Sequence, residues 1–541
     1  MSDSASERDA ALERLAGASR EPFDLLVIGG GATGLGVALD AAARGFAVAL
    51  VEADDFAKGT SSRATKLVHG GVRYLAQGDV RLVREALRER ALLLHNAPHL
   101  TGPLPFMVPA YGLRGRLWDT WFYAAGLSLY DLLAGRAGLG RTQILGQERA
   151  LAEAPGLRRQ RPDAGLVGAV RYVDGQFDDA RVAVALARTA ARQGACMVNH
   201  CRVTGFEGAG RARRLAGVEV EDRETGRRIA VAARCVVNAT GVWVDDVRRL
   251  EAPSTRAMLA PSQGAHLVVD RAFFPGSTAL LVPRTADGRV LFAVPWLGRV
   301  ILGTTDTPRT DRPLEPRPFA AEVEFILGEA GRYLELAPTP RDVRSAWAGL
   351  RPLVKPAGSD RATKTISREH AIVVSPHGLV TVTGGKWTTY RAMAEDVLAA
   401  CFREGLLEPR PAGVTRHLSL IGAPPSGGPR VPLSEPPGLH LYGSEAEDVL
   451  ALPGADREIL PGFTEAMVRF AVRREFARTV EDCLARRSRQ LFLDAAAAAG
   501  AAEAVAAIIA DELGPGFDAA ASSDAFVQLA RGYRLEAAAE Q

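Results

Sequence analysis

Three glycines with the spacing of a dinucleotide-binding turn lie near the start of the chain. The pattern Gly29-x-Gly31-x-x-Gly34 follows an apolar run at 23–28, and Glu52 follows the next apolar run at 46–51. Such glycines permit a tight turn and let backbone N–H groups reach a pyrophosphate at a helix N-terminus. An acid about 20 residues further on binds a ribose hydroxyl. The sequence therefore predicts a dinucleotide-binding βαβ unit.

Two later segments indicate which dinucleotide to expect. Residues 235–243 are typical of a strand that ends in Ala239-Thr240-Gly241, and residues 381–390 of a strand, a glycine pair and a helix start. The second segment can point another helix N-terminus at the ribityl chain and pyrimidine edge of a flavin, which a NAD dehydrogenase does not need. FAD is the predicted cofactor. We expect it to bind non-covalently, because no cysteine or histidine stands where attachment can be argued.

The composition is that of an ordinary globular protein. The 541 residues predict two to four domains, and 47% apolar with 24% charged residues excludes disordered, collagen-like and disulfide-scaffold classes. A net charge of +3 does not favour nucleic-acid binding. The five cysteines form no CxxC pair and the nine histidines show no metal-ligand spacing, so we expect free thiols, a reducing compartment and no metal.

Several elements are expected to position these motifs. A helix is predicted at 79–95 with Asp79 as its N-cap. Short apolar runs separated by turn residues predict antiparallel strands within 264–308.

Composition changes along the chain divide it into four parts. We expect a flexible or weakly helical extension, an FAD-binding domain interleaved with a substrate-binding domain, a Pro/Gly-rich linker and a helical domain. Their bounds are 1–20, 21–410, 411–440 and 441–541, with the substrate sheet mainly at about 80–165 and 255–375.

Five motifs in order resemble the FAD-dependent glycerol-3-phosphate dehydrogenases of the aerobic, respiratory type. They are GTSSRATKLVHGGVRYL (59–75), NATGVW (238–243), PWLGRVILGTTDT (295–307), GLRPL (349–353) and GGKWTTYRAMAE (384–395). The resemblance is close over roughly 23–400 and looser in the C-terminal part. It implies an α/β fold: a glutathione-reductase-type, Rossmann-like FAD domain, an antiparallel-sheet substrate domain and a C-terminal helical domain.

The resemblance also assigns cofactor-binding residues. Those implied for the fingerprint and the following segment are Gly29, Gly31, Gly34, Glu52, Thr60, Ser61, Ser62, Thr65 and Lys66. Those implied for the adenine side are Val203, Ala239, Thr240 and Gly241, and those for the flavin-ring and ribityl side are Asp306, Gly385 and Thr388. Arg63 and Trp387 depart from the family pattern and bear on access to the flavin.

A substrate pocket is implied by six further matches, at His69, Arg73, Tyr74, Arg351, Arg368 and Lys386. Arginines and a lysine are the usual clamp for a phosphate monoester, although a surface salt bridge is the ordinary interpretation of any one of them. The implied reaction is oxidation of sn-glycerol 3-phosphate to dihydroxyacetone phosphate, with hydride transfer from C2 to flavin N5. His69, Arg351 and Lys386 are the candidate catalytic residues. His69 is either the base or an anchor for the flavin ring, whereas His95, His99 and His266 are interpreted as structural.

The electron acceptor is a membrane quinone in one branch of the family and oxygen in its soluble oxidases. Residues 114–135, opened by Arg114 and Arg116, combine aromatic and apolar side chains that suit a helix in a membrane interface, or a core-packing helix. Arginines between 469 and 489 add either an anionic-lipid face or a solvated helix face. We expect a cytoplasmic protein peripherally associated with the inner face of the cell membrane, and a homodimer is an assembly that the sequence leaves open.

Two other functions are compatible with the flavin motifs. An amine-oxidising flavoenzyme of the same fold would bind a carboxylate with one arginine and an aromatic cage instead of several converging cations. A non-catalytic flavin-binding protein would need the flavin motifs but not the substrate cations.

Overall fold

The glycine motif connects β1 (Phe23–Ile28) to α2 (Ala32–Ala43) in the computed structural model. The structure describes residues 3–71, 75, 79–208, 214–285, 288–355, 370–425 and 430–535. Gly29 has a φ of +107°, and a Cβ on Gly34 would overlap the carbonyl oxygen of Gly29. The turn therefore requires glycine at both positions, because any side chain would separate the strand from the helix that follows it.

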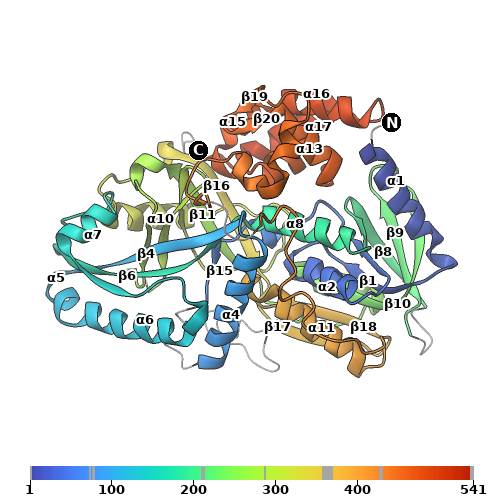
Figure 1. Ribbon diagram of the computed structural model, residues 1–541, viewed down its shortest axis with the longest axis horizontal. Helices are drawn as coiled ribbons and strands as arrows, with labels where there is room; N and C mark the ends of the chain where they lie inside the picture. The colour runs from blue at the N-terminus through green and yellow to red at the C-terminus, as the bar shows by residue number, and fades with distance from the viewer. Residues whose placement is uncertain are drawn as a thin grey trace.

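The sheet around β1 is parallel and buried, which matches the continuous apolar runs of its strands. Its order is β17-β18-β10-β1-β2-β7, and β17 alone runs antiparallel to its neighbour. The further strands of this sheet are β2 (Val48–Val51), β7 (Cys196–Val198), β10 (Arg228–Asn238), β17 (His370–Val374) and β18 (Leu379–Gly384). Helix α2 lies between α8 (Asp179–Arg192) and α11 (Tyr390–Arg403) (Figure 1).

The long strand β10 belongs both to the parallel sheet and to an antiparallel extension of it. In it, β8 (Cys201–Glu207) pairs with β9 (Gly217–Asp222), which pairs with β10. Helix α9 (Val244–Glu251) follows the Ala239-Thr240-Gly241 turn.

The second large sheet carries the predicted antiparallel strands, and that prediction is confirmed. Its order is β15-β11-β14-β13-β12-β4-β6-β3, with β16 beside β11 and β5 beside β6. Its strands are β3 (Leu67–Val68), β4 (Thr101–Tyr111), β5 (Gln143–Gly146), β6 (Leu166–Phe177), β11 (Ser262–Asp270), β12 (Ala279–Val282), β13 (Leu291–Trp296), β14 (Arg299–Gly303), β15 (Thr307–Pro308) and β16 (Val343–Arg351).

Helices cover this second sheet on both faces. Along β4, Phe106 and Val108 join one apolar core whereas Met107 joins another, as alternation in a strand requires. Helix α6 (Thr120–Ala134) packs with the first core, and α10 (Ala320–Tyr333) with the second. The predicted helix at 79–95 is α4 (Val80–Asn96), and the Asp79 side chain accepts the Leu82 N–H at 2.9 Å. The other helices of this part are α5 (Gly112–Arg114) and α7 (Gln147–Glu153).

The C-terminal part is helical and covers the edge of the molecule opposite α6 (Figure 1). Its helices are α12 (Ala446–Leu450), α13 (Glu465–Arg474), α14 (Gln490–Leu493), α15 (Ala495–Gly500), α16 (Ala502–Leu513) and α17 (Ala519–Arg531). A short hairpin of β19 (Glu458–Leu460) and β20 (Phe463–Thr464) precedes α13. Within the described residues, the structure contains no helix long and apolar enough to cross a membrane.

The N-terminal extension is helical over most of its length, which agrees with the helical alternative of the two expected for it. Helix α1 (Asp3–Ala16) lies against β7, β10 and α13. Leu12 and Leu15 are buried in the apolar core beneath it, and Arg8 forms an ion pair of 2.6 Å with Asp222. Helix α1 stays packed on these strands because Leu12 and Leu15 cover apolar surface that would otherwise be exposed.

Candidate flavin and substrate site

The glycine turn is closed by Glu52 and Ser61. Glu52 Oε2 accepts the N–H of Gly30 at 2.6 Å, and its Oε1 accepts the N–H of Asp54 at 2.9 Å. Ser61 Oγ accepts the N–H of Ala32 at the start of α2, at 2.9 Å. Burial raises the pKa of Glu52 to about 7, although both backbone donors favour the carboxylate. The turn thus places an acid beside the N-terminus of α2, as in a dinucleotide-binding turn.

The segment 59–70 lies between the two large sheets. Thr60 Oγ1 donates to the carbonyl of Leu350 in β16 at 2.6 Å. On the other side, the Trp387 indole donates to the Ser61 carbonyl at 2.9 Å. Thr388 Oγ1 donates to the His69 carbonyl at 3.4 Å. These bonds bring three sequence-predicted segments together.

Lys66 supports that segment from the interior. Its ammonium is fully buried and contacts both carboxylate oxygens of Asp179, at 2.8 and 2.9 Å, and the carbonyl of Ser62 at 2.7 Å. Burial lowers the pKa of Lys66 to about 7. The nearby charge of Arg489 also lowers this pKa, whereas the carboxylate of Asp179 raises it. Lys66 therefore has no surface toward the dinucleotide turn, and any effect on a cofactor passes through the main chain.

Arg351 and Asp306 form the charged end of the second sheet. Arg351 Nη1 lies 3.3 Å from Asp306 Oδ1, which also accepts the Ser262 hydroxyl. Arg351 Nη2 donates to the carbonyl of Thr305 at 3.0 Å. A Cβ on Gly264 would overlap this guanidinium. Strand β11 therefore has no side chain at the position where Arg351 crosses it.

His266 belongs to this group, although its sequence context suggested a structural role. Its Nε2 lies 2.9 Å from Thr65 Oγ1, and its ring stacks on Trp347 with centroids 5.3 Å apart. Burial lowers the pKa of His266 well below 6.5, and the charges of Lys66 and Arg351 add to the effect. The signal was present in β11, where Ser262, Gly264 and His266 share one face by alternation.

Lys386 lines a polar cavity of about 210 Å³ between α4 and the start of α11. The other lining residues are Arg81, Leu82, Glu85, His370, Gly385, Thr389 and Asp396. His370 Nε2 lies 3.0 Å from Asp396 Oδ2. Gly385 has a φ of +73° and a Cβ there would press on Met393, so the chain can turn toward Lys386 only with glycine.

The remaining predicted residues fall into three groups. Ala239, Thr240 and Gly241 lie beside the glycine turn, where a Cβ on Gly29 would come within 2.8 Å of the Ala239 carbonyl oxygen. Val203 is half-buried in β8. Arg73, Tyr74 and Arg368 lie outside the described residues. The residues that the structure does describe fit FAD, because the glycine turn opens α2 directly after β1 and the acid Glu52 lies at that turn.

The two departures from the family pattern have different surroundings. Arg63 is buried and donates to Glu315 at 2.6 Å and to the carbonyl of Ala348 in β16 at 3.4 Å, so its guanidinium is tied to the second sheet. Trp387 packs edge-on against Phe177 and Tyr390 while its indole holds Ser61. Trp387 therefore contacts the predicted cofactor segment from another part of the chain, whereas Arg63 belongs to that segment and ties it to Glu315.

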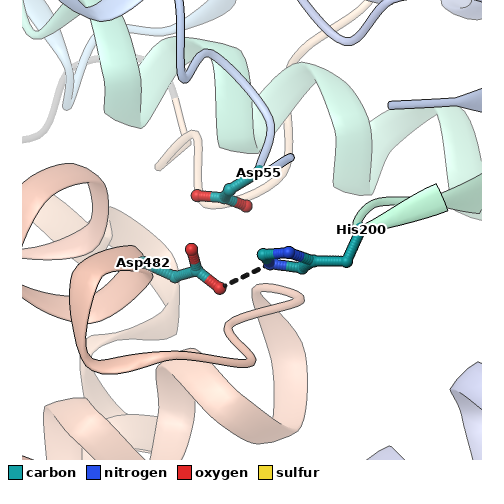
Figure 2. A group of neighbouring side chains, drawn as sticks. All are labelled: Asp55, His200 and Asp482. Atoms are coloured by element: carbon teal, nitrogen blue, oxygen red, sulfur yellow. Dashed lines mark hydrogen bonds and ion pairs between the residues drawn. The ribbon is translucent and has the colours of Figure 1, made fainter. Parts of the chain in front are cut away.

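Within the described chain, one group of side chains has the composition of a metal site. Asp55, His200 and Asp482 converge from three parts of the chain, and His200 Nε2 lies 2.9 Å from Asp482 Oδ2 (Figure 2). Both carboxylates already have cationic partners: Arg486 contacts Asp55 and Asp482, and Arg487 contacts Asp55. Because guanidinium groups supply the positive charge, the group is an ionic contact between the FAD domain and the helical domain.

Most arginines between 469 and 489 are buried or paired with acids, which corrects the expectation of one continuous basic face; Arg474 is exposed. Arg486, Arg487 and Arg489 are buried. Arg469 and Arg473 pair with Glu512, at 2.8 and 2.6 Å, on the helical domain itself. Their sequence spacing suggested an exposed face, but packing against the FAD domain encloses most of these charges.

The fold, the glycine turn and the second glycine pair define an FAD-dependent oxidoreductase, and the family model with the description "FAD dependent oxidoreductase" matches residues 24–391. The family model described as "C-terminal domain of alpha-glycerophosphate oxidase" matches residues 438–519.

The chain belongs to the FAD-dependent glycerol-3-phosphate dehydrogenase family. It is 40% identical to glycerol-3-phosphate dehydrogenase SDP6 of Arabidopsis thaliana, a mitochondrial protein, over 94% of this chain and 85% of that protein. It is 41% identical to the human mitochondrial glycerol-3-phosphate dehydrogenase, over 94% of this chain and 72% of the relative. The crystal structure of glycerol-3-phosphate dehydrogenase from Bacillus halodurans, complexed with FAD, covers both chains fully with a TM-score of 0.76 and 29% identity. The predicted fold, cofactor and enzyme class are confirmed.

Proposed function

We propose that this chain oxidises sn-glycerol 3-phosphate at C2 to dihydroxyacetone phosphate. The observation that supports it best is the convergence of Arg351, the segment 59–70 and Lys386 through the Thr60–Leu350 and Thr388–His69 bonds. These bonds hold the strand that carries Arg351 and the turn that carries Lys386 against the flavin-binding segment, and cations from distant parts of the chain are a usual means of binding a phosphate monoester. FAD, when bound, supplies the acceptor for the hydride at N5. An amine-oxidising enzyme would need only one such cation, and the family assignment also disfavours it.

The described residues have distinct proposed roles. Arg351 and Lys386 bind the phosphate and stabilise the developing alkoxide. Arg351 is held in place by Asp306 and the Thr305 carbonyl. His69 takes the proton of the C2 hydroxyl. His266, kept neutral by its lowered pKa, positions Thr65 through its ring nitrogen. Arg73, Tyr74 and Arg368 stay predicted substrate residues.

We further propose that electrons pass to a membrane quinone at the inner face of the cell membrane. Helix α6 and the turn before it carry an exposed apolar face: Leu113, Trp118, Trp121, Phe122 and Leu132 are 58–76% exposed. Ala124, Leu127 and Tyr130 on the same helix are buried, so the helix packs on the core with one side only. Exposed aromatic and leucine side chains of this kind favour insertion into a lipid interface.

Anaerobic flavin reduction tests the proposed activity. The holoenzyme is mixed with sn-glycerol 3-phosphate without oxygen, and loss of the yellow flavin absorbance is followed. Rapid bleaching supports the proposal, and no bleaching despite bound FAD overturns it. Adding either air or a water-soluble quinone to the reduced enzyme then separates the acceptors. Fast recovery with quinone and slow recovery with air supports a quinone-linked dehydrogenase, whereas fast recovery with air favours an oxidase.

A further inference from the structure

A cavity of about 320 Å³ lies where three parts of the chain meet, away from the flavin and substrate site. Its walls come from α1, from the end of α8 with β7, and from α13 with the residues that follow it (Figure 1). This volume is at the lower end of the range for small-molecule sites, about 300–1,000 Å³. The cavity exists because α1 is docked across the gap between the FAD domain and the helical domain.

Eight residues of the cavity lining are apolar, and half of them are alanines. Its apolar members are Ala10, Ala11, Ala191, Ala195, Cys196, Met197, Val472 and Phe476. Such a surface favours an aliphatic group over water, because each buried methylene gains about 0.8 kcal/mol of transfer free energy.

The rim of the cavity carries an excess of positive charge. Five arginines line it, Arg8, Arg14, Arg473, Arg474 and Arg478, against one acid, Glu7. Three of them have close carboxylate partners outside the lining: Arg8 with Asp222, Arg473 with Glu512 and Arg478 with Glu224, each at 2.6 Å.

The other two arginines are weakly compensated. Arg14 is exposed and donates to the Gly194 carbonyl at 2.9 Å, and within the described chain it has no carboxylate within 4.0 Å. Arg474 reaches only Glu7, at 3.9 Å. Guanidinium groups in this position offer charge-assisted hydrogen bonds to an anion.

We propose that this cavity binds an amphiphilic anion, an aliphatic chain with a carboxylate head, with the chain against the alanines and the head at the arginine rim, where Arg14 and Arg474 have no close carboxylate among the described residues. Occupancy would also tie the domains together. Asn199, which lines the cavity, donates to Asp55 Oδ1 at 3.1 Å and to the Phe476 carbonyl at 2.9 Å. A ligand that binds the native arrangement therefore raises the unfolding temperature of the protein.

Calorimetric titration of the holoenzyme with octanoate, below its micelle-forming concentration, tests the proposal. Octan-1-ol and inorganic phosphate serve as probes that have only the chain or only the charge. We expect octanoate to bind at least tenfold more tightly than either and to raise the unfolding temperature. Equal affinity for phosphate and octanoate would overturn the proposal, because the apolar lining would then contribute nothing.

Variants locate the site on the molecule. Ala10→Trp fills the cavity from an exposed position of α1, and the double variant Arg14→Glu/Arg474→Glu reverses its charge. Both should weaken octanoate binding at least tenfold with turnover and FAD content unchanged. Arg149→Glu, at an exposed arginine of α7, is the matched control and should bind as the wild type. Unchanged binding in both cavity variants, or binding lost in Trp121→Ser on the face of α6, would overturn the assignment.

Discussion

Arg489 donates a hydrogen bond of 2.8 Å from Nη2 to the main-chain carbonyl of Ser62, 427 residues earlier in the chain. The guanidinium is fully buried and also lies 3.2 Å from Asp179 Oδ1. Ser62 ends the turn Thr60–Ser62, which carries three of the predicted cofactor residues. The helical domain therefore supports the cofactor segment from beneath, in addition to covering the FAD domain.

Replacing this arginine should release FAD. In Arg489→Met, Asp178 loses its ion pair with the guanidinium while Asp179 keeps Lys66, and breaking a buried ion pair costs about 3–5 kcal/mol of stability. We expect a lower ratio of flavin to protein absorbance and a lower urea midpoint. Arg457→Met, at an exposed arginine of the same domain, should cost less than about 1 kcal/mol. A fully flavinated, equally stable Arg489→Met protein would contradict the supporting role.

Stability at acidic pH should depend on His200. Burial opposes protonation of its ring, but Asp482 at 2.9 Å, with Asp55 and Glu224, outweighs burial and raises the pKa of His200 above 6.5. The stabilisation is therefore fully present below pH 6.5 and disappears as the pH rises through the raised value.

His200→Gln measures this contribution. The variant should lose about 1.5–3 kcal/mol of unfolding free energy at pH 5.5, typical of a charged hydrogen bond, and less at pH 9. Urea unfolding at the two pH values checks the difference, and His417→Gln, at an exposed histidine, should show none. A loss that is the same at both pH values would show that the ring matters for packing and not for charge.

Turnover should depend on His69. Removing a general base lowers kcat by about 10²–10⁴-fold, so His69→Ala should reduce steady-state oxidation of sn-glycerol 3-phosphate by at least the lower figure. The FAD content of the variant must be measured alongside, because the alternative role of His69 is to anchor the flavin ring. His95→Ala, at an exposed histidine of α4, is the control. Near-normal turnover with full FAD occupancy would remove His69 as the base and leave the anchoring role.

Vesicle binding should require the exposed face of α6. The double variant Trp118→Ser/Trp121→Ser removes two side chains that are 66% and 65% exposed, and each contributes apolar area to a lipid interface. We expect it to stay in the supernatant when sedimented with anionic vesicles at low salt, while the wild type pellets. Leu450→Ser, at an exposed leucine of the helical domain, should pellet as the wild type. A wild-type protein that does not pellet would contradict the membrane proposal.

Local patterns in the sequence determined the dinucleotide-binding part of this protein. Gly29, Gly34 and Glu52 act within one strand-turn-helix-strand unit, where turn geometry and the helix N-terminus depend on close neighbours in the chain. The Asp79 cap and the strands within 264–308 were predictable for the same reason, and the family motifs added the enzyme class.

Only the tertiary structure decided the environment of the charged residues. Arg486, Arg487 and Arg489 have the spacing of an exposed basic face, but partners from residues 55 to 179 enclose them. Lys66 has the spacing of a cofactor ligand and is buried against Asp179, whereas His266 has no motif and meets Thr65. Helix propensity and alternation are local properties, but the burial and pairing of a charge depend on segments hundreds of residues away, which no short pattern records.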